Sequence, residues 1–256
     1  MIKGALIDFG GTIDSDGIHW FNMFREAYSR AYANPATCPD YKQPVASIFD
    51  ENRAVSPAIS DESLREAYIY AERTLGRTPM ITPDLGFHRT LMIKLSLQTE
   101  FLRSKGILIP DTAQRDIVDY CYSKVESHIS SVSGPVLETL SQKMPVVLVT
   151  NFYGNMHSVL DEFRLSHIFR DVIESSVVGV RKPDVEIFRL GVEALGLEPS
   201  QTVMIGDSGE KDIVPAQSIG CHTIWLRGET WSNTDCTPER TISSLSELMP
   251  VECCQA

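Results

Sequence analysis

Short apolar runs rich in β-branched residues recur along the chain and predict buried strands. The runs are ALIDF (5–9), VVLVTN (146–151), TVMIGD (202–207) and HTIWL (222–226). Several end in Asn or Asp, which is typical of parallel strands that are buried on both faces. Helical patterns accompany the later runs, in PVLETLSQK, PDVEIFRLGVEALG and DIVPAQSIG. This alternation predicts an α/β fold with a doubly wound, Rossmann-like parallel sheet.

The segment between the first two runs has a different character. It carries helical periodicity in WFNMFREAYSRAYA, DESLREAYIYAERTLG, LMIKLSLQTEFLRSKG and DIVDYCYSKVESHI, with little strand pattern. Proline and turn residues in NPATCPDYKQP and RTPMITPDLG divide it. We therefore expect an α/β core domain made of residues 1–14 and 131–256, and an inserted helical domain made of residues 15–130.

Composition and charge narrow the classes of partner. The chain has 256 residues, is 43% hydrophobic and carries a formal net charge of −11. Such acidity argues against a nucleic-acid or anionic membrane surface, because both need clustered Lys and Arg. The first apolar run is too short for a signal peptide, and no run approaches the roughly 18 apolar residues of a spanning helix. We expect a soluble, cytoplasmic protein with no membrane or nucleic-acid partner, and its six cysteines as reduced thiols.

Polar side chains gather where the predicted strands end. Ligands bind at the carboxyl ends of the strands in open α/β sheets, so the sheet could bring these groups together. Carboxylates 4 Å apart repel by about 4 kcal/mol at an effective dielectric of 20, so a cluster of them calls for a cation. Oxygen ligands without His or Cys favour a hard ion, and Mg²⁺ suits a site that leaves room for phosphate. The groups are Asp8 with GGT, Thr150 with Asn151, Lys182 in GVRKPD, and Asp207 with Asp212 in GDSGEKD.

The other groups at these strand ends are of types that bind phosphate. Gly10 and Gly11 can expose backbone N–H groups, Thr150 and Asn151 offer a hydroxyl and an amide, and Lys182 is a point charge. Carboxylate, metal and lysine together suggest phosphoryl transfer to Asp8.

Four ordered motifs resemble those of the haloacid dehalogenase (HAD) superfamily of aspartate-nucleophile hydrolases. They are DFGGT, VLVTN, VGVRKPDVEIF and MIGDSGEKDI. Four motifs in the right order are far more specific than one. The helical insert, placed directly after the first motif, resembles the mobile C1-type cap of that superfamily.

The resemblance implies a role for each matching residue. Asp8 would be the nucleophile, and Thr150 with Lys182 would hold the transferred phosphoryl group of a small phosphorylated substrate. Asp8, Asp207 and the Gly10 carbonyl would bind Mg²⁺, and Asp212 would hold a metal-bound water or the lysine. The further residues implied to bind substrate are Gly11, Thr12 and Asn151.

Gly10 departs from the pattern that this resemblance implies. Phosphatases of the superfamily usually carry Asp there, which protonates the leaving oxygen and then activates water. A general acid-base contributes about 10²- to 10⁴-fold to rate. Its loss would be severe for an alkoxide leaving group and would matter little for acyl or aryl phosphates. Glycine keeps its backbone carbonyl, so a metal site can survive without the acid.

Three functions therefore remain open. The first is a Mg²⁺-dependent, phosphatase-like hydrolase with a weakened acid-base step. The second is cleavage of C–P or C–halogen bonds; the metal-binding acid in GDS disfavours the halide, and C–P cleavage requires a Schiff-base lysine in the cap. The third is a non-catalytic phosphate-binding protein. The substrate itself is not predicted, because the cap selects it and shows no motif. The candidates for the Schiff-base lysine that C–P cleavage requires are Lys42, Lys94, Lys105 and Lys124.

Overall fold

The structure is a computed structural model, and it describes residues 1–33, 59–228 and 236–249. The chain divides into two compact units, one made of residues 1–19 and 125–256 and the other of residues 20–124. Three of the cysteines, Cys121, Cys221 and Cys236, form no disulfide in the part of the chain that the structure describes. Lys42 and the other three cysteines, Cys38, Cys253 and Cys254, lie outside the described residues.

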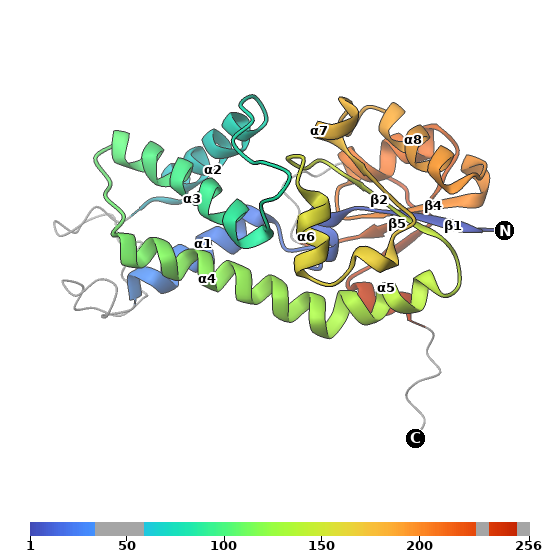
Figure 1. Cartoon of the computed structure of the whole chain (residues 1–256), viewed down its shortest axis with the longest axis horizontal. Helices are drawn as coiled ribbons and strands as arrows, with labels where there is room; N and C mark the ends of the chain where they lie inside the picture. The colour runs from blue at the N-terminus through green and yellow to red at the C-terminus, as the bar shows by residue number, and fades with distance from the viewer. Residues whose placement is uncertain (34–58, 229–235, 250–256) are drawn as a thin grey trace, which may run out of the picture. The chain divides into compact units, whose positions relative to one another are not determined.

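The first unit is built on a six-stranded sheet whose order is β3-β2-β1-β4-β5-β6. Every neighbouring pair is parallel. Figure 1 colours the chain from its N-terminus to its C-terminus. The predicted α/β fold with a doubly wound sheet is thus confirmed. The strands are β1 (Gly4–Ile7), β2 (Val146–Thr150), β3 (Asp171–Glu174), β4 (Thr202–Gly206), β5 (His222–Leu226) and β6 (Arg240–Ile242).

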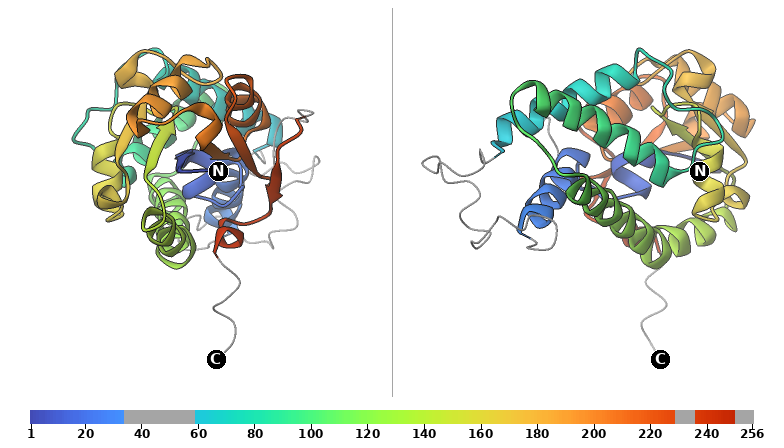
Figure 2. Two further views of the ribbon diagram at one scale, coloured as in Figure 1. Left: turned by 90° about the vertical axis from the view of Figure 1, so that its right-hand side faces the viewer. Right: turned by 60° about the vertical axis from the view of Figure 1, so that its left-hand side comes forward.

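Helices of this unit flank the sheet, as the views in Figures 1 and 2 show. The core between sheet and helices includes Leu6, Val149 and Met204 from the strands and Phe188 and Val192 from a helix. That helix, α8, places its buried residues on one face, which is the pattern of an amphipathic helix. The helices are α5 (Gly134–Ser141), α6 (Met156–Glu162), α7 (Ser175–Val178), α8 (Glu186–Leu195) and α9 (Val214–Ser218).

The second unit is helical in its described residues. Its helices are α1 (Trp20–Ala33), α2 (Asp61–Leu75), α3 (Phe87–Ser104) and most of α4 (Asp111–His128). Helix α2 packs on α3, and the buried Lys94 of α3 forms an ion pair with the half-buried Glu72 of α2 at 2.7 Å. No described helix is both long enough and apolar enough to cross a membrane.

Candidate active site

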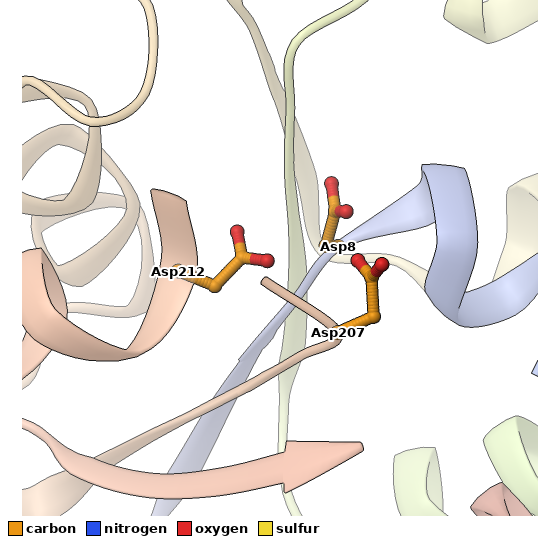
Figure 3. A group of neighbouring side chains, drawn as sticks. All are labelled: Asp8, Asp207 and Asp212. Atoms are coloured by element: carbon orange, nitrogen blue, oxygen red, sulfur yellow. The ribbon is translucent and has the colours of Figure 1, made fainter. Parts of the chain in front are cut away.

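Three carboxylates meet at the carboxyl edge of the sheet. Asp8 follows β1, Asp207 follows β4, and Asp212 lies in the short helical turn η6 (Gly209–Ile213). One oxygen from each lies within 4.8 Å of the others, and Figure 3 shows the three side chains gathered around one point. The strand order explains the meeting, because β1 pairs directly with β4.

Lys182 lies between two of these carboxylates. Its Nζ is 2.6 Å from Asp8 Oδ1 and 2.6 Å from Asp212 Oδ1, and its side chain is buried. Burial alone would lower the pKa of Lys182, but the charges of Asp212 and Asp8 outweigh it and raise the pKa. The lysine therefore stays charged, and the third of its three N–H donors is left over for another anion.

Burial and mutual repulsion disfavour the ionised forms of Asp8 and Asp207. Burial raises the pKa of Asp8 to about 6, against the lowering effect of Lys182 and with a further rise from Asp212. Burial also raises the pKa of Asp207 well above its ordinary value, and the charges of Asp212 and Asp8 add to the rise. Three acids share one lysine, so the site is short of positive charge.

The donor set and this charge deficit fit Mg²⁺. All side-chain ligands on offer are carboxylate oxygens, which are the ligands of hard cations. The other predicted ligand, the carbonyl of Gly10, belongs to the turn that follows Asp8. A divalent cation would compensate the two negative charges that Lys182 leaves unbalanced.

The glycines of the first motif differ from each other in what they require. Gly11 has φ of +88°, and a Cβ there would lie 2.4 Å from Asp207 Oδ2, so both backbone and space call for glycine. Gly10 has φ of −76° and ψ of 117°, which any residue adopts. A Cβ at Gly10 would meet no atom within 4 Å. The structure thus leaves room for a Cβ at Gly10 and not at Gly11.

Two of the predicted phosphate-binding groups are used within the protein. The Gly11 N–H donates to Asp14 Oδ1 at 2.7 Å, so this donor already has a partner. The Asn151 amide donates to the Lys182 carbonyl at 3.0 Å and accepts from the Lys182 N–H at 2.8 Å. Both groups thus have partners within the protein, and their direct contact with a substrate stays a prediction. Asn151 orients the backbone of Lys182, and Asp14 holds the turn after Asp8.

The remaining predicted residues lie at the same edge. Thr150 is the last residue of β2 and is buried. Thr12 is also buried, and its hydroxyl is 3.5 Å from Asp207 Oδ1, so it faces the acidic cluster. Asp212 is fully buried, and its second oxygen accepts the Ser208 N–H at 3.0 Å. This contact fixes the carboxylate that Lys182 meets.

Three residues at or beside the site were missed by the sequence analysis. Asp14 is a buried acid that also accepts the Ser15 hydroxyl at 2.8 Å. Trp225 of β5 donates its indole N–H to the Asp207 carbonyl at 2.8 Å. Glu174 ends β3, a strand too short for the pattern to predict. Only the spacing of Asp14, three residues after Gly11, is a pattern that could have marked a turn-capping acid.

The sequence also matches a family model. The model of the haloacid dehalogenase-like hydrolase family matches residues 2–220. The chain belongs to this family. The predicted superfamily, and with it a hydrolase, is confirmed.

Relatives within the family carry several names. Haloacid dehalogenase-like hydrolase domain-containing protein 3 of Mus musculus is 26% identical over 224 residues, which are 82% of this chain and 87% of that protein. Phosphoserine phosphatase of Thermus thermophilus is 33% identical over 89 residues, 34% of this chain and 36% of that protein. Glyceraldehyde 3-phosphate phosphatase of Methanocaldococcus jannaschii is 36% identical over 85 residues, 32% of this chain and 37% of that protein. The chain thus matches about a third of the length of the two named phosphatases.

Solved structures agree on the fold. The putative hydrolase YfnB of Bacillus subtilis, bound to magnesium, has a TM-score of 0.56 at 20% identity and covers 96% of each chain. The L-2-haloacid dehalogenase of Xanthobacter autotrophicus has a TM-score of 0.52 at 15% identity and covers 97% of each chain. At such identities the likeness concerns the fold alone.

Proposed function

We propose that this chain is a Mg²⁺-dependent phosphohydrolase that acts on a small phosphorylated molecule through Asp8. The observation that carries the proposal is the position of Asp8, which contacts the buried Lys182 and lies within 4.8 Å of the Asp207 and Asp212 carboxylates. The names of the two matched phosphatases support the choice of a phosphorylated substrate. We infer that the helical unit, residues 20–124, acts as the cap.

In the proposed reaction, a carboxylate oxygen of Asp8 attacks the phosphorus atom. The bond from phosphorus to the leaving oxygen breaks, and the phosphoryl group becomes an acyl phosphate on Asp8. Water then attacks that phosphorus, which releases inorganic phosphate and restores the carboxylate. The contact with Lys182 keeps Asp8 ionised despite its burial.

The neighbouring residues bind and orient the phosphoryl group. The third N–H donor of Lys182 and the hydroxyl of Thr150 would bind its oxygens. Asp8, Asp207 and the Gly10 carbonyl would hold Mg²⁺, which neutralises the charge that develops on the phosphoryl oxygens. Asp212 keeps Lys182 in place through its 2.6 Å contact.

The glycine at position 10 indicates which class of leaving group the site can serve. No side chain is present there to protonate a departing oxygen, so we propose that the substrates best served are those whose leaving group departs without a proton. Acyl phosphates, phosphoanhydrides and aryl phosphates meet that condition. Alkyl phosphates would turn over slowly, by a margin of about 10²- to 10⁴-fold.

C–P bond cleavage has less support. It requires a free lysine in the cap, and the described candidates are each ion-paired within the second unit. Lys94 pairs with Glu72 at 2.7 Å, Lys124 lies 3.8 Å from Glu26, and Lys105 pairs with Glu66.

A panel of phosphorylated compounds tests the proposal. It comprises an acyl phosphate, an aryl phosphate, an alkyl phosphate and phosphonoacetaldehyde, each with and without Mg²⁺. We expect Mg²⁺-dependent release of phosphate from the first two at the highest kcat/KM. Turnover of phosphonoacetaldehyde alone would favour C–P cleavage, and a flat panel would favour a phosphate-binding protein.

The metal site gives a separate prediction. Asp207→Asn removes one carboxylate of the cluster with little change of shape. Mutation of a residue that only hydrogen-bonds to a metal ligand already lowers metal affinity by about 10- to 100-fold. Loss of a ligand should therefore lower the Mg²⁺ affinity by at least about 100-fold. Titration calorimetry on the purified protein measures this. Glu193→Gln, which removes the same charge from an exposed position of α8, is the matched control. Equal Mg²⁺ affinity in Asp207→Asn and wild type would contradict the assignment.

A further inference from the structure

Glu174 is a buried acid that the proposed reaction does not use. It is the last residue of β3 and is only 1% exposed. In the register of β2 and β3, Glu174 is the partner of Thr150. The acid therefore lies at the carboxyl edge of the sheet, beside the strand end that carries Thr150.

The Glu174 carboxylate accepts backbone N–H groups of the segment that follows β2. Gly154 donates to Oε1, and Met156 donates to Oε2 at 3.2 Å. Asn155 contributes a third backbone N–H. These groups precede or begin α6, where backbone N–H groups have no partner within the helix. Burial raises the pKa of Glu174, and these three donors act against the rise.

The same two segments are joined at two more places. Asn151 makes two hydrogen bonds with the backbone of Lys182. The hydroxyl of Ser175, which directly follows Glu174, donates to the Phe152 carbonyl at 3.4 Å. Residues 151–156 and the segment from Glu174 to Lys182 are thus tied together by side chains from both. Glu174 makes the largest share of these contacts and is the only ionisable group among them.

We propose that Glu174 is a positioning residue, which fixes the segment after β2 and so holds Thr150 and Lys182 in register against Asp8. The inference rests on the proposed function for its kinetic consequences. Its structural part, the link from Glu174 through residues 151–156 to Lys182, can be tested without measuring activity.

Glu174→Gln tests this link with almost no change in volume. Glutamine has one acceptor oxygen and an NH₂ group, so its NH₂ group faces a backbone N–H that can only donate. A displacement of the order of 1 Å in a reacting group costs about 10²-fold in rate. We therefore expect kcat for an aryl phosphate to fall by about 10- to 100-fold, with KM nearly unchanged. The affinity for orthovanadate in the presence of Mg²⁺ should fall in parallel.

Hydrogen exchange provides a readout that is independent of turnover. In Glu174→Gln, the amides of residues 154–156 should exchange faster, and so should the Lys182 amide, which bonds to Asn151 and not to Glu174. Glu174→Asp keeps the charge but shortens the side chain, and should fall between wild type and Glu174→Gln in both readouts. If Glu174→Gln does not fold, Glu174→Asp carries the comparison.

Val192→Ala is the matched control, because it removes buried methyl groups from α8 in the hydrophobic core. It should lower the melting temperature and leave kcat and exchange at Lys182 unchanged. Unchanged kcat and unchanged Lys182 exchange in Glu174→Gln would overturn the proposal, as would an equal loss of kcat in Val192→Ala. If wild type turns over no phosphate, the proposed function fails, and the exchange at Lys182 alone decides whether Glu174 positions it.

Discussion

Asp8→Asn is expected to abolish phosphate turnover while leaving the protein folded. Asparagine has no carboxylate oxygen to attack phosphorus, and removal of residues that act as nucleophile or with it costs about 10⁴- to 10⁶-fold in kcat. Lys182 keeps its 2.6 Å contact with Asp212, so the buried lysine is not left without a counter-charge. Steady-state and single-turnover assays with an aryl phosphate at saturating Mg²⁺ measure the loss.

The same substitution should stabilise the metal-free protein at neutral pH. Burial raises the pKa of Asp8 to about 6 from an unfolded value of 3.8, so the folded state binds the proton more tightly than the unfolded state does. The stability that this group contributes is present below pH 4 and is lost as pH rises through about 6. Asparagine does not ionise, so Asp8→Asn does not lose this stability as pH rises. Thermal unfolding at pH 4 and pH 7 without metal should therefore show a smaller fall in Tm for Asp8→Asn than for wild type.

An inactive but unfolded Asp8→Asn would say nothing about chemistry, so the melting curve is part of the experiment. Asp161→Asn, an exposed acid near the end of α6, is the matched control and should retain full activity. Retention of more than a few per cent of wild-type kcat by folded Asp8→Asn would contradict the role of Asp8 as nucleophile.

Gly10→Asp is expected to raise turnover of alkyl phosphates by up to about 10²- to 10⁴-fold, the usual contribution of a general acid-base. The backbone at Gly10 has φ of −76°, and a Cβ there has no atom within 4 Å, so neither the backbone nor the first side-chain atom opposes the substitution. The added group can protonate the leaving oxygen and then take a proton from water. Aryl and acyl phosphate turnover should change much less, because these leaving groups need no proton.

One effect opposes the gain. A further carboxylate enters a site where Asp207 already has a raised pKa, and like charges repel. The comparison is therefore made at saturating Mg²⁺. Gly10→Asn, which has the same shape but cannot carry the proton, is the matched control and should not raise alkyl phosphate turnover. If kcat/KM for alkyl phosphates is the same in Gly10→Asp and Gly10→Asn, an acid at position 10 does not supply the missing proton transfer.

The sheet could be predicted from the sequence because four of its strands are apolar runs. The patterns at 5–9, 146–151, 202–207 and 222–226 correspond to β1, β2, β4 and β5. The strands β3 and β6 were missed. Each has only three or four residues, and β3 begins with an exposed Asp and ends with a buried Glu, so neither carries an apolar run.

The meeting of Asp8, Asp207, Asp212 and Lys182 was predictable for a topological reason, since the carboxyl ends of parallel strands share one edge. The hydrogen bonds that Gly11 and Asn151 make within the protein were not. The partner of Asn151 is the backbone of Lys182, 31 residues away, and a sequence pattern does not reveal such a pairing. Glu174 was out of reach for a similar reason, because its partners lie on a neighbouring segment 18 to 20 residues earlier.

Rapid quench during turnover of an aryl phosphate with Mg²⁺, followed by mass spectrometry of the digested protein, tests the central claim most directly. The account predicts that a peptide containing Asp8 gains the mass of one phosphoryl group within the first turnover. Borohydride treatment before digestion should convert that residue to homoserine, which marks the carboxyl carbon as the site. Turnover without any phosphorylated peptide, or with the phosphoryl group on another residue, would contradict it.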